Sequence, residues 1–385
     1  MEKQSENNNI IKIIPIGELL FRDTTSFNKK ESNWIISKKI PNLSVLYGAI
    51  ISMQLRKGKF KNAKEMIQNI AKGNTEKQKE IDKELKNKIC IRGIYLTDGE
   101  KLYIPAPFDL FYFDCEGGRK IARGIYEDGI CYSPEEHGIW REEWERVENK
   151  YISLEDYYEG YIGGELDDIE LVDEDYFFTY YHKVGIEKDV NRSTKKEHLY
   201  YMDMVTFQSE EMGYVIEIDS EESLSFSKNG ELIHLGGERR TAFIEEMTRK
   251  EVKILEKCKR IDNNAKYVKL VFTAPFLLSG ESEDKIKIFD EERNINIKLK
   301  VINKVEYAGG YNIANKTQKR VRKVIPSGSV LLLDMTNVEK DDRVNLYDYI
   351  KHSFYIQEED KYFSSFFLIE ESENIGKEEK VYERE

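Results

Sequence analysis

The chain of 385 residues is long enough for two or three domains of about 150 residues each. Its 72 Asp and Glu residues outnumber its 60 Lys and Arg residues, and the formal net charge of −12 excludes nucleic-acid binding through a general basic coat. Any nucleic-acid site must therefore be a local basic patch.

The four cysteines lie far apart, without a Cys-x-x-Cys pair or histidines at metal spacing. This pattern argues against a zinc site and a disulfide framework, and it favours reduced thiols inside the cell. The N-terminus is polar, and no apolar run approaches the roughly 18 residues that span a bilayer. We therefore expect a soluble, cytoplasmic protein.

The first hundred residues predict a strand at 10–16, a helix at 44–55 and a hairpin formed by 89–96 and 101–104. Pro41 precedes the helix, with Asn42 or Ser44 as its N-cap. The free N–H groups at such a helix start can bind an anion.

Two stretches interrupt this pattern. Residues 57–88 carry ten lysines against five acidic residues and predict a solvated helical insertion. A second insertion covers about 114–175. Residues 151–182, which overlap its end, contain ten Asp and Glu and no Lys or Arg. This charge pattern excludes the block as a nucleic-acid face.

The second half predicts further strands and helices in irregular alternation. Strands are expected at 199–207, 212–218, 267–272, 295–305, 330–333 and 362–369, with helices at 242–254 and near 346. This order is typical of α+β sheets with helices on one face, seen twice. We expect domains at 10–210 and 211–370, followed by a disordered charged tail at 371–385.

The segment Leu-Gly-Gly-Glu-Arg-Arg-Thr-Ala at 235–242 is the first candidate site. Gly236 and Gly237 permit positive φ and close approach of the backbone to a ligand, and the N–H groups of such a turn can bind an anion. Arg239 and Arg240 follow, and guanidinium groups suit phosphate. The alternative is a hairpin turn with two solvated arginines. When this motif is considered alone, the alternative is favoured by about two to one.

Two more basic clusters adjoin turn residues, at 183–196 and 316–323. Their candidate phosphate contacts are Lys183, Arg192, Lys195, Lys316, Lys319, Arg320 and Arg322. The nearby rings of Tyr181, Tyr200, Tyr201 and Tyr311 could stack on bases, and cations with aromatic platforms are the general pattern of single-stranded nucleic-acid binding. Three such clusters in an acidic chain predict RNA binding.

Catalytic signatures are missing from the sequence. There is no P-loop, GxGxxG, HExxH or GxSxG pattern, so we predict no catalytic residues, metal or cofactor. His182, His198 and His234 could each act as the base of a metal-independent ribonuclease, although each is more simply an ordinary strand histidine. A ribonuclease and a purely protein-binding adaptor remain alternatives to an RNA-binding scaffold.

Six motifs in order resemble a known family over about residues 10–335. They are Pro15-x-Gly17 with Leu20-Phe21-Arg22-Asp23, Pro41…Leu46-x-Gly48-Ala49, Pro105-x-Pro107-x-Asp109, Lys183-Val184-Gly185-Ile186…His198-Leu199-Tyr200, Leu235-Gly236-Gly237-Glu238-x-Arg240, and Val324-Ile325-Pro326-Ser327-Gly328-Ser329. The set is similar to the RAMP-superfamily proteins, of the Cas-five-like group, that form subunit three of the type III-B (Cmr) CRISPR effector. The paralogous type III-A subunit shares several of these motifs.

The resemblance implies two ferredoxin-like (RRM-related) domains side by side, with long insertions. It implies a non-catalytic subunit that grips the 5′ handle of the CRISPR RNA and contacts target RNA only indirectly. Its implied protein partners are the large cyclase-bearing subunit and a backbone RAMP subunit. By the same resemblance, Gly236, Gly237, Arg239 and Arg240 lie near the RNA, together with Arg22 and Ser44. The insertions carry no motif of the family, and the last strand lacks its glycine-rich signature.

Overall fold

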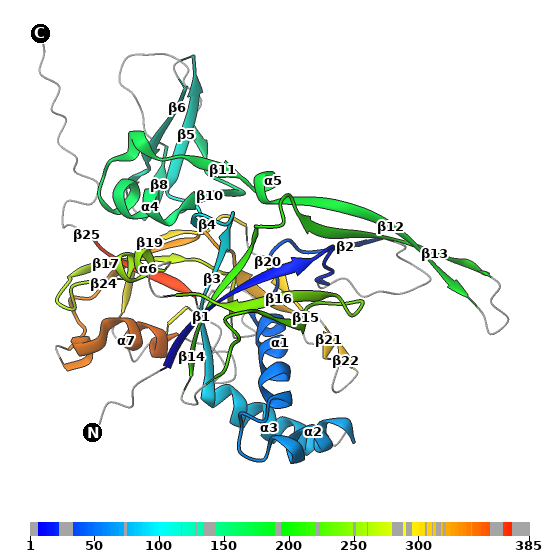
Figure 1. The fold of residues 1–385 in the computed structure, drawn as a ribbon. Helices are drawn as coiled ribbons and strands as arrows, with labels where there is room; N and C mark the ends of the chain where they lie inside the picture. Colours follow the sequence, from blue (N-terminus) through cyan, green and yellow to red (C-terminus); the bar gives the residue numbers. More distant parts are fainter. Residues whose placement is uncertain are drawn as a thin grey trace, which may run out of the picture.

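The computed structural model describes residues 7–22, 34–72, 75–116, 118–127, 129–133, 144–188, 194–220, 224–248, 252–259, 261–278, 288–289, 295–304, 306–309, 311–312, 317–318, 321–339, 341–354 and 365–371. It is a sheet-rich α+β protein (Figure 1), which confirms the expected α+β class. None of the described helices is long and apolar enough to cross a membrane.

The first sheet has eight antiparallel strands, in the order β11-β10-β4-β3-β14-β1-β16-β15. They are β1 (Asn7–Ile16), β3 (Ile89–Thr97), β4 (Leu102–Pro105), β10 (Lys150–Ser153), β11 (Leu171–Asp173), β14 (Gly213–Ser220), β15 (Glu231–His234) and β16 (Thr241–Glu246). Helix α1 (Leu43–Arg56) follows β1 in the chain and packs its apolar side on this sheet.

The second sheet has four antiparallel strands in the order β19-β24-β17-β25. They are β17 (Tyr267–Phe272), β19 (Asn296–Val301), β24 (Val330–Asp334) and β25 (Phe366–Glu371), and helix α7 (Leu346–Ser353) lies between β24 and β25 in the chain.

Smaller elements surround the two sheets. The remaining strands are β2 (Trp34–Ile36), β5 (Leu110–Cys115), β6 (Gly118–Arg123), β7 (Ile125–Glu127), β8 (Ile130–Tyr132), β9 (Glu145–Arg146), β12 (Phe178–Lys188), β13 (Thr194–Phe207), β18 (Phe276–Leu277), β20 (Glu306–Ala308), β21 (Tyr311–Asn312), β22 (Thr317–Gln318) and β23 (Arg322–Ile325). The remaining helices are α2 (Ala63–Ala71), α3 (Thr75–Lys88), α4 (Leu154–Asp156), α5 (Glu174–Phe177), α6 (Lys253–Cys258), the π-helix η1 (Tyr157–Ile162) and the 3-10 helices η2 (Leu166–Asp168) and η4 (Asp341–Asn345).

Alternating strand residues divide the interior into layers. In β14, Ile216 packs toward α1, whereas Val215 belongs to the core that the first sheet shares with the second. In β17, Val271 faces that shared core and Leu270 packs toward α7. The order is thus α1, first sheet, second sheet and α7, with most of the 110–171 segment closing the shared core.

A buried ionic cluster lies in the shared core. Lys269 of β17 is 1% exposed, and its Nζ lies 3.1 Å from Oδ2 of Asp109 and 2.9 Å from Oε2 of Glu371. Tyr126 and Tyr161 donate their phenol hydrogens to the Asp109 carboxylate. Burial raises the pKa of Asp109, whereas the charge of Lys269 and these hydrogen bonds lower it. The lowering is the larger effect, so the pKa lies below its usual value.

Most predicted elements are present, including the two-helix insertion α2–α3, but two expectations were wrong. The helix expected at 242–254 is the strand β16 followed by a short α6, because Ala242 and Ile244 alternate into the core beside β1. The first sheet also continues past the expected boundary at 210, since β14 and β16 both pair with β1. The second sheet begins at Tyr267. Of the expected tail, Glu371 ends β25 and the rest lies outside the described residues.

Replacing Lys269 with Met should lower the free energy of unfolding by about 3 kcal/mol, because removal of one partner leaves a buried, uncompensated carboxylate at Asp109. Urea denaturation measures the loss. The control is Lys298→Met, which removes a half-exposed lysine paired with Asp334 and should change stability by less than about 0.5 kcal/mol. Equal losses in the two variants would show that the buried cluster does not stabilise the fold.

Candidate nucleic-acid interface

The glycine pair of the 235–242 segment forms a hairpin turn between β15 and β16 that packs on the segment after β1. Gly236 has a φ of +79°, and a Cβ there would lie 2.8 Å from the Leu20 carbonyl oxygen. The Gly237 N–H donates to that same oxygen at 2.8 Å. Backbone packing therefore accounts for Gly236, in agreement with the hairpin-turn alternative.

The two arginines of the turn differ in their surroundings. Arg240 donates from Nη1 to Oε2 of Glu18 at 2.7 Å, and its side chain is only 23% exposed. Arg239 is exposed and makes no ion pair within the described part of the chain. Arg240 is thus largely committed to holding the turn against the loop after β1, while Arg239 remains available to a ligand.

The backbone beyond the glycines is strained. Glu238 and Arg239 have φ values of 56° and 54°, a region that non-glycine residues rarely adopt. Their N–H groups donate to no acceptor in the described part of the chain, and such turns can bind an anion. The negative charges of the exposed Glu238 and the nearby Glu18 balance the positive charges of the two arginines. A phosphate is therefore attracted to this turn only at short range, where it can contact Arg239 or the backbone N–H groups directly.

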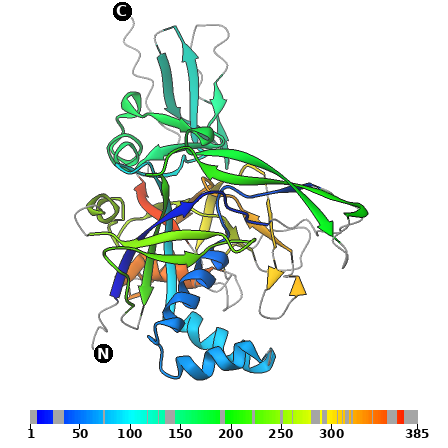
Figure 2. The same ribbon diagram turned by 45° about the vertical axis from the view of Figure 1, so that its right-hand side comes forward.

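A long hairpin, which we call the arm, projects beside this turn (Figures 1 and 2). It consists of β12 and β13, with β2 pairing parallel to β13. On one side, the covered face, Ile35, Met202 and Met204 pack against Leu20. The turn lies on the same side, since Nη2 of Arg240 approaches Sδ of Met204 at 3.4 Å.

The covered face brings several predicted residues together. Lys183 pairs with Met202 and Tyr181 pairs with Met204, so both side chains project toward this face. The ring of Tyr200 crosses Gly185 there, since a Cβ at that glycine would lie 2.1 Å from the ring. Lys183 and two nearby aromatic rings thus share a face with Arg240 of the turn, whereas Tyr201 points to the opposite face.

Two predicted residues lie on neighbouring loops. Arg22 is exposed and comes two residues after Leu20, the residue that contacts the turn. Ser44 lies in the first turn of α1, where the N-cap is Asn42. The Asn42 amide donates to the Gly309 carbonyl oxygen at 3.3 Å, so this helix start faces the second half of the chain.

The third basic cluster is described only in part. Arg322 lies on β23, opposite Ala308 of β20, and is partly buried. Arg192, Lys316, Lys319 and Arg320 lie outside the described residues, as does the side chain of Lys195 on β13. These contacts stay predictions.

The sequence missed two side chains on the other side of the arm, the open face, where His182, one of the candidate bases, also lies. Trp34 projects from β2, and Asp203 of β13 links its indole to the imidazole of His182. No motif marks Trp34, which follows a polar loop. Asp203 was hidden because its pairing with His182 arises only from the register of the hairpin.

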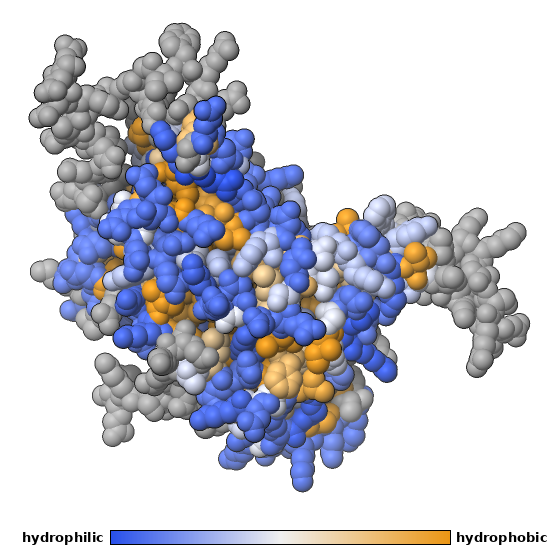
Figure 3. Space-filling view, turned by 45° about the horizontal axis from the view of Figure 1, so that its top comes forward, coloured by the Kyte–Doolittle hydropathy of each residue, from blue (hydrophilic) through white to orange (hydrophobic). Residues whose placement is uncertain are grey.

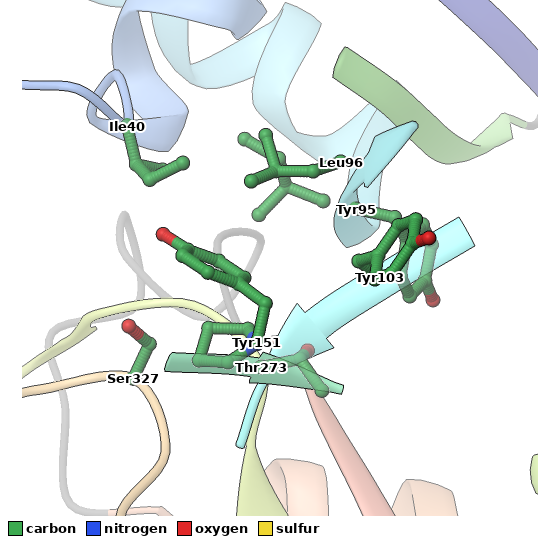
Figure 4. A pocket seen from close by; sticks show the side chains of 9 residues that line it. Ile40, Tyr95, Leu96, Tyr103, Tyr151, Thr273 and Ser327 are labelled. Carbon is green, nitrogen blue, oxygen red and sulfur yellow. The ribbon is translucent and has the colours of Figure 1, made fainter. Parts of the chain in front are cut away.

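No other described feature suggests a small-molecule or metal site. The depression between Tyr95, Tyr103, Tyr151 and the Thr273 and Ser327 loops (Figure 4) has room for about one water molecule. Among the described residues, no group of three or more His, Cys, Asp and Glu side chains could hold a metal ion.

Comparison with known proteins gives one family. The sequence matches the family described as CRISPR-associated protein (Cas_Cmr3) over residues 11–360. The CRISPR system CMR subunit Cmr3 of Saccharolobus solfataricus is 27% identical over 169 residues, which are 43% of this chain and 48% of that protein. The aligned part thus spans about half the length of this relative.

Two solved structures are similar in overall course. A chain of the type III-B Cmr-beta complex bound to cognate target RNA and AMPPnP has a TM-score of 0.48 at 15% identity, covering 92% of this chain and 93% of that one. A chain of the Csm3–Csm4 subcomplex of the type III-A interference complex has a TM-score of 0.39 at 13% identity, covering 84% and 92%.

Replacing Arg240 with Ala should lower the free energy of unfolding by about 1 kcal/mol, because the half-buried ion pair with Glu18 is lost. Arg239→Ala should leave stability within about 0.5 kcal/mol of the parent, because this side chain is exposed. Thermal denaturation of both variants measures the difference. A larger loss for Arg239→Ala than for Arg240→Ala would contradict the assignment of their roles.

Proposed function

The chain belongs to the CRISPR-associated Cmr3 family, and from this premise we propose that it is the RNA-binding subunit of a type III-B (Cmr) effector complex. In this proposal it grips the 5′ repeat-derived handle of the CRISPR RNA and has no catalytic activity. It docks against the large cyclase-bearing subunit and a backbone RAMP subunit, and it contacts target RNA only indirectly. The observation that carries the proposal is the family match over residues 11–360.

The geometry of the turn and the arm supports the proposed RNA site. The turn offers the Arg239 guanidinium and the backbone N–H groups of a strained loop. The covered face of the arm adds Lys183 and the half-exposed ring of Tyr181. Cations for the backbone beside rings for the bases are what single-stranded RNA requires. Of the acidic block at 151–182, only the last five residues belong to the arm, and they contain no acidic side chain.

We also propose that each sheet is the core of a ferredoxin-like unit. In the first sheet, the order β3-β14-β1-β16 places the third and first core strands at the centre, with α1 between β1 and β3 in the chain. The order β19-β24-β17-β25 repeats this arrangement, with α7 before the last strand. Each unit retains one of the two helices of the ferredoxin-like motif among the described residues.

The double variant Arg239→Ala/Lys183→Ala should bind the 5′ handle of the CRISPR RNA more weakly. Two lost phosphate contacts reduce the slope of log affinity against log salt by about 1.4, at about 0.7 for each contact with a single strand. Fluorescence anisotropy at several salt concentrations measures the slope. Lys61→Ala/Lys101→Ala, which removes two exposed lysines outside the turn and the arm, is the charge-matched control and should change the slope little.

Two outcomes would decide against the proposed site, one from the anisotropy titration and one from a pull-down of the protein partners with nuclease. An unchanged slope and affinity in the double variant would contradict RNA binding at the turn and the covered face. Retention of the protein partners after nuclease treatment, with no RNA binding by the parent protein, would favour the protein-binding adaptor instead.

The ribonuclease alternative has one favourable observation. Nδ1 of His182 lies 2.6 Å from Oδ1 of Asp203, which leaves Nε2 exposed as a potential base. We expect precursor CRISPR RNA to remain intact with the purified protein in EDTA, because the sequence carries none of the catalytic signatures sought above. Gel analysis of the RNA tests this. If the parent protein cleaves the RNA, and if His182→Ala abolishes cleavage while the His198→Ala and His234→Ala variants still cleave, the protein is a ribonuclease.

A further inference from the structure

The open face of the arm is an uncovered surface of mixed aromatic and aliphatic side chains. Trp34, Ile36, Val184 and Tyr201 are 58%, 56%, 55% and 43% exposed. In the register, Tyr201 lies between Trp34 of β2 and Val184 of β12, and Ile36 lies beside Asp203. In Figure 3 much of the arm at the right is pale, with orange residues among blue ones. The four side chains give the arm an exposed aromatic and aliphatic surface.

One nearly buried carboxylate orients two rings on this face. Asp203 is 8% exposed, and its Oδ2 accepts from Nε1 of Trp34 at 2.7 Å while its Oδ1 lies 2.6 Å from Nδ1 of His182. Because Oδ1 accepts the Nδ1 hydrogen, Nε2 of His182 points away from the sheet, and this side chain is 74% exposed. The indole and the imidazole are thus positioned before any ligand arrives, which lowers the entropic cost of binding.

We propose that the open face of the arm is a nucleobase-binding subsite for single-stranded RNA. One unstacked base lies on Trp34 or Tyr201, and Nε2 of His182 makes a hydrogen bond to the same strand. The two ring centroids are 6.2 Å apart and the rings are tilted by 44°, so each ring offers its own platform. The inference rests on the proposed RNA-binding function and adds a second contact surface to it, separate from the turn and the covered face.

The chemistry of this face favours RNA over a protein partner. A protein interface would bury the free imidazole nitrogen, which costs free energy unless the partner supplies a matching group. RNA supplies phosphate, 2′-hydroxyl and base-edge groups beside every base. Close by, Lys38 donates from Nζ to the carbonyl oxygen of Tyr307, whose ring is 51% exposed. A cation and a third ring therefore lie just beyond the end of β2.

Fluorescence of Trp34 tests the subsite directly. The chain has three tryptophans, so Trp140→Phe/Trp144→Phe leaves Trp34 as the only reporter. Oligouridine and oligoadenosine of about 12 nucleotides should quench it on binding, whereas an abasic oligomer with the same phosphates should not. If the background variant fails to fold, the ¹⁹F signal of Trp34 in 5-fluorotryptophan-labelled parent protein replaces this reporter.

A ring deletion gives the energetic test. Tyr201→Ala should weaken binding of both oligomers at least about fivefold, because a base–ring stack contributes about 1–3 kcal/mol. Tyr132→Ala is the matched control, since this ring is similarly exposed and its strand, β8, lies far from the arm in Figure 1. It should leave affinity unchanged.

The outcomes separate this inference from the proposed function. RNA binding that depends on Arg239 but leaves the Trp34 signal and the Tyr201→Ala affinity unchanged would overturn the subsite alone. Absence of RNA binding by the parent protein would overturn both. Loss of a protein subunit from nuclease-treated complexes of Trp34→Ala and Tyr201→Ala, with RNA affinity intact, would assign the open face to a protein interface and overturn the subsite.

Discussion

The buried ion pair of Lys269 and Asp109 holds the second sheet against the 110–171 segment. Both side chains are buried, so each charge is tolerable only while the other lies within hydrogen-bond reach. Their partners come from β25, β7 and the π-helix, which ties the second sheet to the 110–171 segment. Next to Asp109, Phe108 donates its N–H to the Gly328 carbonyl oxygen, so the motifs at 105–109 and 324–329 dock the halves together.

The RNA-binding surfaces that we propose are held in place by other contacts between segments far apart in the sequence. The turn is fixed by Leu20 and by the Glu18–Arg240 pair, and the arm is fixed by Leu20 and Asp203. Sequence motifs that looked like ligand contacts thus serve partly to pack the chain: Gly236 admits a carbonyl oxygen and Gly185 admits a tyrosine ring. What remains for a ligand is a small set of exposed groups, chiefly Arg239, Lys183 and the rings of the arm.

Much of the fold could be predicted because apolar periodicity reports burial directly. The strand at 10–16, the helix at 44–55 and the hairpin around Gly99 all follow that rule. The segment at 242–254 could not, because pairing with β1 overrides the helical propensity of its residues. The candidate site was predictable only by residue type. Neither the commitment of Arg240 to Glu18 nor the Asp203 carboxylate beneath Trp34 and His182 is visible before strand register is known. Arg192, Lys195, Lys316, Lys319 and Arg320 remain predictions from sequence alone.

Ultraviolet crosslinking of the complex isolated from its native host, followed by mass spectrometry of the protein and sequencing of the bound RNA, tests the central claim most directly. If this chain holds the CRISPR RNA as proposed, crosslinked peptides will come from the turn at 235–240 and from the arm, and the attached RNA will begin with the repeat-derived handle. Crosslinks confined to the α2–α3 insertion or to the acidic residues 151–177 before the arm, or RNA without the handle, would contradict it.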